Sequence, residues 1–304
     1  MKEQIDSTLV PNGKAKFVRT ISTKKIINKY NKFGFDSRYL FNDKKEIAIY
    51  ECLNTTYRFY YPFEIAGDSA FYEFFQKFEW YYMPWKWEHE ITKDYLKDDM
   101  SVLEVGCAHG AFLKKINEEF KLKNCVGLEL NKSTPNESNQ WIIINQYVQD
   151  YEKENQEKFD LVCSFQVLEH IADVHSFIKA KIGCLKKGGK LIISVPNNDS
   201  FIKDSDATLN LPPHHMGLWD TKSLKSLVNI FPIKLVKIHY EKLQDYHVDS
   251  HVNNTYYSKY DDLTSKFIRK WHKITGKYQK RLTQINNNKD AIIGHTILAV
   301  YEKL

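Results

Sequence analysis

The chain has 304 residues, of which 42% are hydrophobic and 27% charged, a composition typical of one large globular α/β domain with an additional segment. It contains no apolar run long enough to predict a transmembrane helix, and its polar N-terminus does not resemble a signal peptide. Five cysteines without C-x-x-C spacing argue against a disulfide framework or a zinc site, so we expect a cytoplasmic protein.

The net charge of +6 is concentrated in one segment of the chain. Between His251 and Asp290, nine lysines and arginines stand against three aspartates and glutamates, which accounts for the whole excess. A charge confined to one segment argues against a general nucleic-acid-binding surface.

Residues 1–85 are expected to form an extension or lid on a main domain that spans residues 86–304. The extension contains a predicted helix near residues 22–30 and an aromatic cluster at residues 71–87. Because this part has few aliphatic residues for a core of its own, we expect it to pack on the main domain.

From residue 86 onward, short β-branched runs alternate with helical patterns. Helices are predicted at 86–97, 111–120, 173–185 and 221–231, and strands at 101–105, 124–130, 141–148, 159–165, 190–195, 232–240 and 291–301. This alternation predicts a seven-stranded, mostly parallel sheet with helices on both faces. Ligands of such sheets bind beyond the carboxyl ends of the strands.

An insertion at about residues 241–290 precedes the last strand. Its apolar residues recur at helical spacing and predict one basic amphipathic helix over about 255–285, with the apolar stripe Leu263, Phe267, Trp271, Ile274, Tyr278, Leu282 and Ile285. Three roles remain open for this helix: to cover the sheet, to attract an anionic acceptor, or to contact an anionic membrane surface.

The run VLEVGCAHG (102–110) places an acidic residue and two glycines between a strand and a helix. It resembles the first motif of class I S-adenosylmethionine methyltransferases, which have a Rossmann-like fold, although alanine replaces the usual middle glycine. A G-x-G-x-x-G dinucleotide loop fits poorly. The resemblance implies that S-adenosylmethionine is the cofactor and is contacted by Glu104, Gly106, Cys107, Ala108 and Gly110.

Later segments resemble further motifs of the same family. A carboxylate at Glu129, followed by Leu130, ends the next strand, where it can accept the ribose hydroxyls. The resemblance implies that the stretch Val148, Gln149 and Asp150 frames the adenine ring, and that Gln166 and Val167 line the pocket near the sulfonium.

The segment LPPHHMGLWD (211–220) resembles a P-P-H-H element of bacterial methyltransferases that modify sugars, lipids and quinone precursors. Histidine suits the removal of a hydroxyl proton because its free pKa lies near 6.5. We expect His214 or His215 to be the base, with His170 as a third candidate; alternatively, these histidines orient the loop. No third ligand is spaced to join the pair in a metal site, so no metal is expected.

The segment YYMPWKWEHE (81–90) resembles the residues before the first strand in bacterial glycan methyltransferases. The resemblance implies a lid over the cofactor in which Tyr81, Tyr82 or Trp87 closes over the sulfonium, helped by cation–π attraction. The alternative is that the rings of the aromatic cluster pack the extension onto the domain.

These patterns together predict an O-methyltransferase that acts on a sugar-containing acceptor, in surface polysaccharide synthesis. The expected acceptor is a small molecule or glycan, with an anionic nucleotide-linked or phosphorylated sugar among the candidates. N-methylation of an amino sugar, a nicotinamide-dependent oxidoreductase and a non-catalytic cofactor-binding scaffold are the alternatives. Nucleic-acid methylation is disfavoured because the chain has no N-P-P-Y-type motif.

Overall fold

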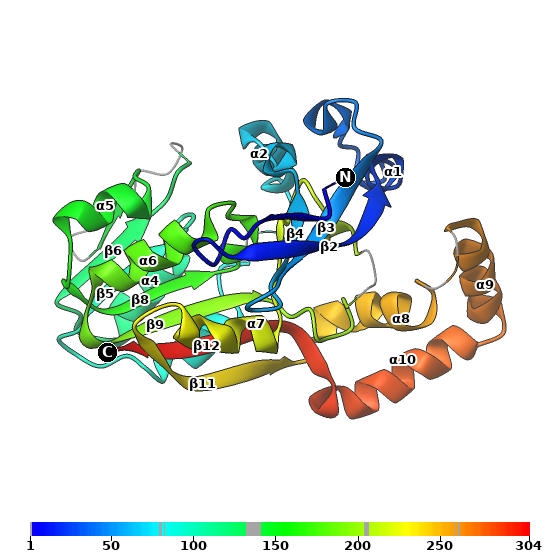
Figure 1. Cartoon of the computed structure of the whole chain (residues 1–304). Coiled ribbons are helices and arrows are strands. Elements are labelled where there is room, and N and C mark those ends of the chain that lie inside the picture. Colours follow the sequence, from blue (N-terminus) through cyan, green and yellow to red (C-terminus); the bar gives the residue numbers. More distant parts are fainter. Residues whose placement is uncertain are drawn as a thin grey trace.

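The computed structural model describes residues 2–78, 81, 83–131, 141–203, 207–258, 260 and 262–304. These residues form two sheets (Figure 1). The larger has seven strands in the order β11-β12-β9-β8-β5-β6-β7. Its strands are β5 (Ser101–Val105), β6 (Asn124–Leu128), β7 (Ile142–Ile144), β8 (Phe159–Phe165), β9 (Leu185–Pro196), β11 (Ile233–Lys242) and β12 (Ile293–Lys303).

The five strands from β9 to β7 run parallel, and β12 and β11 complete the sheet in antiparallel pairs. The flanking helices are α3 (Trp87–Lys93), α4 (Ala111–Glu119), α5 (Val148–Glu154), α6 (Val174–Cys184) and α7 (Thr221–Ser226). Alternate residues of β8 face opposite sides: Val162 packs in the cluster that contains Ile178 of α6, and Cys163 in the cluster that contains Phe112 of α4. Helices therefore cover both faces, and the predicted fold class is confirmed.

The N-terminal part forms a five-stranded antiparallel sheet that the sequence analysis did not predict. Its order is β1 (Gln4–Asp6), β2 (Lys14–Ser22), β3 (Glu46–Cys52), β4 (Arg58–Tyr61) and β10 (Gly217–Leu218). The last strand comes from the main domain and pairs Gly217 with Phe59. Beside it, Tyr57 stacks on the buried Trp219 with ring centroids 4.2 Å apart. The segment that carries His214 and His215 is thereby attached to the N-terminal sheet.

The aromatic cluster mainly packs the N-terminal part together. Helix α2 (Ser69–Phe75) buries Phe71 and Phe75 against Tyr30 of α1 (Thr23–Asn31) and against Leu211 and Met216. Most rings of this cluster are therefore core residues, as the packing alternative predicts.

Two predicted elements differ from the structure. Residues 141–148 were predicted as one strand, but β7 ends at Ile144 and Val148 begins α5. The predicted single helix over 255–285 is also wrong, because the chain forms α8 (Val248–Tyr256), α9 (Asp262–Ile274) and α10 (Lys277–Asn288). Gly276, with φ of 73°, breaks the run between α9 and α10, which diverge in Figure 1. None of the described helices is long and apolar enough to cross a membrane.

A fully buried lysine in α6 makes the stability of the fold depend on pH. Lys181 donates to the Ser164 hydroxyl at 2.5 Å, and burial lowers its pKa to about 7. Between pH 7 and about 10, the unfolded chain holds this proton and the folded chain does not, so this residue makes folding more favourable as pH rises.

We expect Lys181→Met to be more stable than the wild type at pH 7 by several kcal/mol, since each pKa unit corresponds to about 1.4 kcal/mol. The advantage should shrink steadily from pH 7 to 9. Denaturant unfolding of both proteins at each pH measures the difference between their free energies of unfolding. The contributions of cysteine and tyrosine titration are common to both proteins and cancel in this difference. A difference that does not change with pH would contradict the prediction.

Candidate active site

A cavity of about 2210 Å³ lies beyond the carboxyl ends of β5, β6 and β8. Of the residues predicted to bind the cofactor, its lining includes Tyr81, Glu104, Gly106, Cys107, Ala108, Glu129, Leu130, Val148, Gln149, Gln166 and Val167. Segments from α2 and from residues 207–215 border the opposite side. The volume exceeds that of typical single-ligand pockets, about 300–1,000 Å³, and so leaves room for a second substrate.

The loop after β5 is shaped to let a ligand approach its backbone. Gly106 has φ of 81°, and a Cβ atom there would lie 2.5 Å from Cγ2 of Val167. Ala108 also has a positive φ, 46°. Alanine can adopt this backbone conformation in place of glycine, but at a conformational cost. Gly110, φ 70°, is the N-cap of α4 and lies near Trp141 rather than in the cavity wall.

Glu104, near the end of β5, is buried, and one of its carboxylate oxygens has no hydrogen-bond partner among the residues that the structure describes. Burial, and secondarily the charge of Glu129, raises its pKa to about 8. An orphaned acceptor in this position fits the amino group of the methionine part of the cofactor, which would supply the missing donor.

Glu129 follows β6 and accepts backbone N–H bonds from Ala108 at 2.9 Å and Asn131 at 3.0 Å. These bonds fix the carboxylate at the rim of the cavity, where ribose hydroxyls can be bound. Of the two candidates beside the adenine ring, Gln149 lines the cavity, whereas Asp150 pairs with Lys153 at 2.7 Å on the surface.

The lid candidates separate in the structure. Tyr81 lines the cavity. Trp87 instead packs, half-buried, against the core cluster that contains Val102 and Phe112, so its predicted place over the sulfonium is corrected to a packing role. Tyr82 lies outside the described residues.

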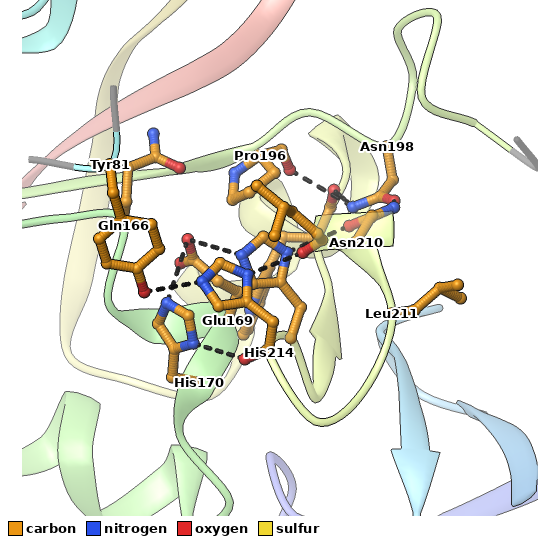
Figure 2. A network of polar contacts seen from close by, with 12 residues as sticks. Tyr81, Gln166, Glu169, His170, Pro196, Asn198, Asn210, Leu211 and His214 are labelled. Carbon is orange, nitrogen blue, oxygen red and sulfur yellow. Dashed lines mark hydrogen bonds and ion pairs between the residues drawn. The ribbon is translucent and has the colours of Figure 1, made fainter. Parts of the chain in front are cut away.

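The three candidate histidines meet in this cavity, and Figure 2 shows His170 and His214 next to Glu169. The rings of His214 and His215 stack with centroids 4.4 Å apart, and His170 lies 4.9 and 5.0 Å from them. Burial lowers the pKa of His170 to about 4 and of His214 to about 3, and it also depresses the pKa of His215 well below its ordinary value. The imidazoles are therefore neutral.

Hydrogen bonds fix the same tautomer in all three rings. Nδ1 of His170 faces the backbone oxygen of His214 at 2.6 Å, and Nδ1 of His214 faces that of Leu209 at 2.9 Å. A carbonyl oxygen can only accept, so each Nδ1 carries the proton and each Nε2 carries a lone pair. The Nε2 atom of His214 accepts from the Tyr81 hydroxyl at 2.8 Å.

Two asparagines set the tautomer of His215 (Figure 2). The amide of Asn198 donates to the Trp219 carbonyl at 3.0 Å, so its oxygen faces Asn210 and accepts from that amide at 2.8 Å. The oxygen of Asn210 is then left to accept from Nδ1 of His215 at 3.3 Å. Its Nε2 atom is consequently unprotonated as well.

Glu169 completes the cluster, and the sequence analysis missed it. It is 1% exposed, and neither carboxylate oxygen accepts a hydrogen bond from the described residues. Its Oε1 atom lies 3.8 Å from Nε2 of His215 and 4.0 Å from Nε2 of His170. Burial raises its pKa to about 8. The available signal was a charged residue four positions after the end of β8 at Phe165.

Comparison with known proteins identifies the class of protein that this cavity belongs to. Residues 80–234, about half of the chain, match the model of a methyltransferase domain. A phosphoethanolamine N-methyltransferase of Haemonchus contortus matches with 14% identity and a TM-score of 0.52, covering 99% of this chain and 70% of its own. A SAM-dependent methyltransferase of Archaeoglobus fulgidus matches with 16% identity and a TM-score of 0.47, over 70% and 90% of the two chains.

At 14% identity the Haemonchus contortus structure supports the fold alone, and no curated protein matches the sequence. The family match, in contrast, covers the loop after β5 that contains Gly106 (the cofactor loop), the end of β8, and the two segments that carry His170 and His214. The chain belongs to the methyltransferase-domain family. It is an S-adenosylmethionine-dependent methyltransferase, as the sequence motifs predict.

Proposed function

We propose that the enzyme methylates a hydroxyl group of a sugar-containing acceptor and that the cluster of His170, His214, His215 and Glu169 receives the hydroxyl proton. The observation that supports this is the convergence of three unprotonated Nε2 atoms and a carboxylate in the cavity that also contains the cofactor loop. A hydroxyl must lose its proton during methylation, whereas a neutral amine is already nucleophilic.

S-adenosylmethionine supplies a methyl group whose bond to a positively charged sulfur breaks readily. The remaining work falls to the residues of this chain. Gly106 and Glu129 hold the donor end of the cavity, and the histidine cluster orients the acceptor oxygen, because alignment accounts for up to about 7–11 kcal/mol of the barrier. The proton passes to an Nε2 atom or directly to Glu169 in its ionised form, which predominates above pH about 8 and whose negative charge stabilises an imidazolium on His215 or His170.

The sugar assignment is supported by the aromatic side chains at this end. Tyr72 and Tyr81 line the cavity beside His170 and His214, and rings of this kind bind the apolar faces of sugars. N-methylation of an amino sugar is the second candidate, and it needs less help from a base. A scaffold role is the third, and the buried acid–imidazole cluster does not favour it.

We also propose that α9 contacts an anionic membrane surface, which would make a lipid-linked sugar the preferred acceptor. Large apolar side chains of α9 are exposed: Leu263 by 80%, Phe267 by 73%, Trp271 by 55% and Ile274 by 71%. Exposed lysines accompany them at Lys266, Lys270 and Lys273. A small anionic acceptor would account for the lysines but not for the apolar stripe, whereas a membrane accounts for both.

The position of α9 agrees with this role. In Figure 1 it stands beyond α8 and α10, away from the seven-stranded sheet. The cavity nevertheless reaches Arg269 of this helix, which donates to Asn253 of α8 at 3.2 Å. A lipid at the α9 surface could therefore place its sugar in the cavity.

The double variant Phe267→Ser, Trp271→Ser should bind vesicles of phosphatidylglycerol and phosphatidylcholine at least about tenfold more weakly, since each lost side chain removes about 1.5–3 kcal/mol of burial. Co-sedimentation at low and high salt measures the binding. Leu53→Ser, which removes an exposed apolar residue from the turn after β3, is the matched control. Equal binding by all three proteins would contradict the membrane contact.

The acceptor is tested with methyl-labelled S-adenosylmethionine and fractionated extract of the source cells. We expect label in a lipid-linked or polymeric glycan, in a methyl ether that survives alkaline hydrolysis. Label on an amine would replace the proposal by N-methylation, and label in nucleic acid or protein would overturn the glycan assignment. Bound cofactor without any labelled product would favour the scaffold.

A further inference from the structure

We infer that the Nε2 atoms of His170, His214 and His215 bind a divalent transition-metal ion next to Glu169. The ligand atoms of these histidines lie within 4.8 Å of one another, and they form the one such cluster found in the described part of the chain. No spacing in the sequence joins a third ligand to the His214–His215 pair. The fold supplies it, because the end of β8 lies against the segment before β10: the Met216 amide donates to the Glu169 carbonyl at 2.8 Å.

The outer hydrogen bonds of the three rings are those of metal-binding histidines. A ligating histidine typically donates its other ring N–H to a carbonyl or carboxylate, which fixes the tautomer and aims the lone pair. Here the acceptors are the backbone oxygens of His214 and Leu209 and the side-chain oxygen of Asn210. Three independent contacts thus prepare three lone pairs to face one region.

The inner side of the cluster contains more acceptors than donors. Three Nε2 lone pairs and both oxygens of the buried Glu169 meet there, and the Tyr81 hydroxyl, on His214, is the donor that the described contacts provide. Buried acceptors without a donor are costly, and a nearby cation lowers the cost of ionising a buried carboxyl group. A divalent cation satisfies all of these groups at once.

The donor set indicates the class of ion. Neutral imidazole nitrogens with a nearby carboxylate suit Zn²⁺, Fe²⁺, Co²⁺ or Mn²⁺ rather than Ca²⁺ or Mg²⁺, which prefer oxygen ligands. Metal–nitrogen bonds of about 2.1 Å require the rings to approach one another by roughly 1 Å. Binding of the ion also requires Nε2 of His214 to give up the hydrogen bond that it accepts from the Tyr81 hydroxyl.

The inference deepens the proposed function and depends on it only for the place of the acceptor. Three histidine ligands leave coordination positions open. A hydroxyl bound there becomes more acidic, and its proton passes to Glu169 while the oxygen takes the methyl group. With the ion present, the imidazoles are ligands and Glu169 is the proton acceptor.

The test is the metal content of protein purified without a polyhistidine tag. We expect about one equivalent of zinc, iron, cobalt or manganese per chain by mass spectrometry. After removal of the metal, added Co²⁺ should produce visible absorption bands. His170→Asn and His215→Asn should weaken Co²⁺ binding at least about 100-fold, and Asn210→Leu, which lies behind His215, about 10- to 100-fold.

His175→Asn is the matched control, because this histidine donates to Leu9 away from the main cavity and should not change Co²⁺ binding. S-adenosylhomocysteine affinity and Tm show that each variant is folded. Wild-type protein that neither retains a metal nor binds Co²⁺, or cluster variants that bind it like the wild type, would overturn the inference. These metal measurements involve no methyl acceptor. An N-methylated product in the labelling experiment would therefore overturn the proposed function without affecting the metal site.

Discussion

Gly106→Ala should lower the affinity for S-adenosylmethionine at least about 100-fold. The added methyl group would lie 2.5 Å from Val167, a residue of the same cavity wall, and φ of 81° is unfavourable for any residue with a Cβ. Backbone strain of about 1–2 kcal/mol and steric overpacking against Val167 of about 1–3 kcal/mol add up at this position. A backbone shift that relieves either of them moves the loop away from the cofactor. Isothermal titration with S-adenosylhomocysteine measures the effect.

A second glycine separates the two causes. Gly188 has φ of 77°, close to the φ of Gly106, but none of the described residues lies within 4 Å of its Cβ position, and the residue does not line the cavity. Gly188→Ala should therefore destabilise the fold by a comparable strain and leave cofactor affinity unchanged. If both variants lose affinity equally, general destabilisation is the cause, and Gly106 has no special part in binding.

The elements that the sequence predicted well are those with a local cause. β8 spans Phe159 to Phe165 as predicted, because a strand buried on both faces is mostly apolar, and only Asp160 and Ser164 are polar in it. The cofactor loop was predictable for a similar reason, since the glycine at 106 is required by backbone geometry that is independent of distant contacts.

The N-terminal sheet was not predictable in the same way. In β2, most residues between Lys14 and Ser22 are exposed, so the strand lacks the apolar alternation that marks a half-buried strand. Its pairing with β3 is also shifted between Phe17 and Arg19, which interrupts the period. The fifth strand, β10, has only two residues and joins from a segment more than 150 positions away along the chain.

The apolar periodicity of the insertion correctly predicted amphipathic helix, but it did not predict which apolar faces are buried. The apolar stripe of α10 is partly buried through Tyr278 and Ile285, whereas that of α9 is exposed at Phe267 and Trp271. Periodicity identifies an apolar helix face, but the partner of that face depends on tertiary structure. The exposure of α9 is what favours a membrane over simple coverage of the sheet.

The candidate site was predicted as separate residues and not as a cluster. His170 and His214 lie 44 positions apart, and only the meeting of β8 with the segment before β10 brings their rings to 4.9 Å. Glu169 went unnoticed because an acidic residue shortly after a strand is usually solvated, whereas here the side chain is buried. The burial that makes Glu169 chemically significant is absent from the sequence pattern.

Glu169→Gln should lower kcat by about 10²–10⁴ without changing the affinity for S-adenosylhomocysteine. Glutamine preserves the size of the side chain but removes both the negative charge and the ability to take a proton, and a positioned base contributes about this factor. The loss is expected whether the proton first reaches a histidine, whose imidazolium Glu169 stabilises, or passes directly to the carboxylate. Single-turnover rates with the labelled acceptor measure the methyl-transfer step itself.

Glu241→Gln is the appropriate control for this change. Glu241 is also a buried glutamate, and burial raises its pKa to about 7. It accepts a hydrogen bond from the Thr296 backbone N–H at 2.9 Å, and Glu241 itself does not line the cavity. This variant should alter stability and leave kcat within a few-fold of the wild type. If Glu169→Gln also stays within tenfold while the acceptor is confirmed as a hydroxyl, proton transfer to the cluster is not required, and the histidines then serve to orient the acceptor.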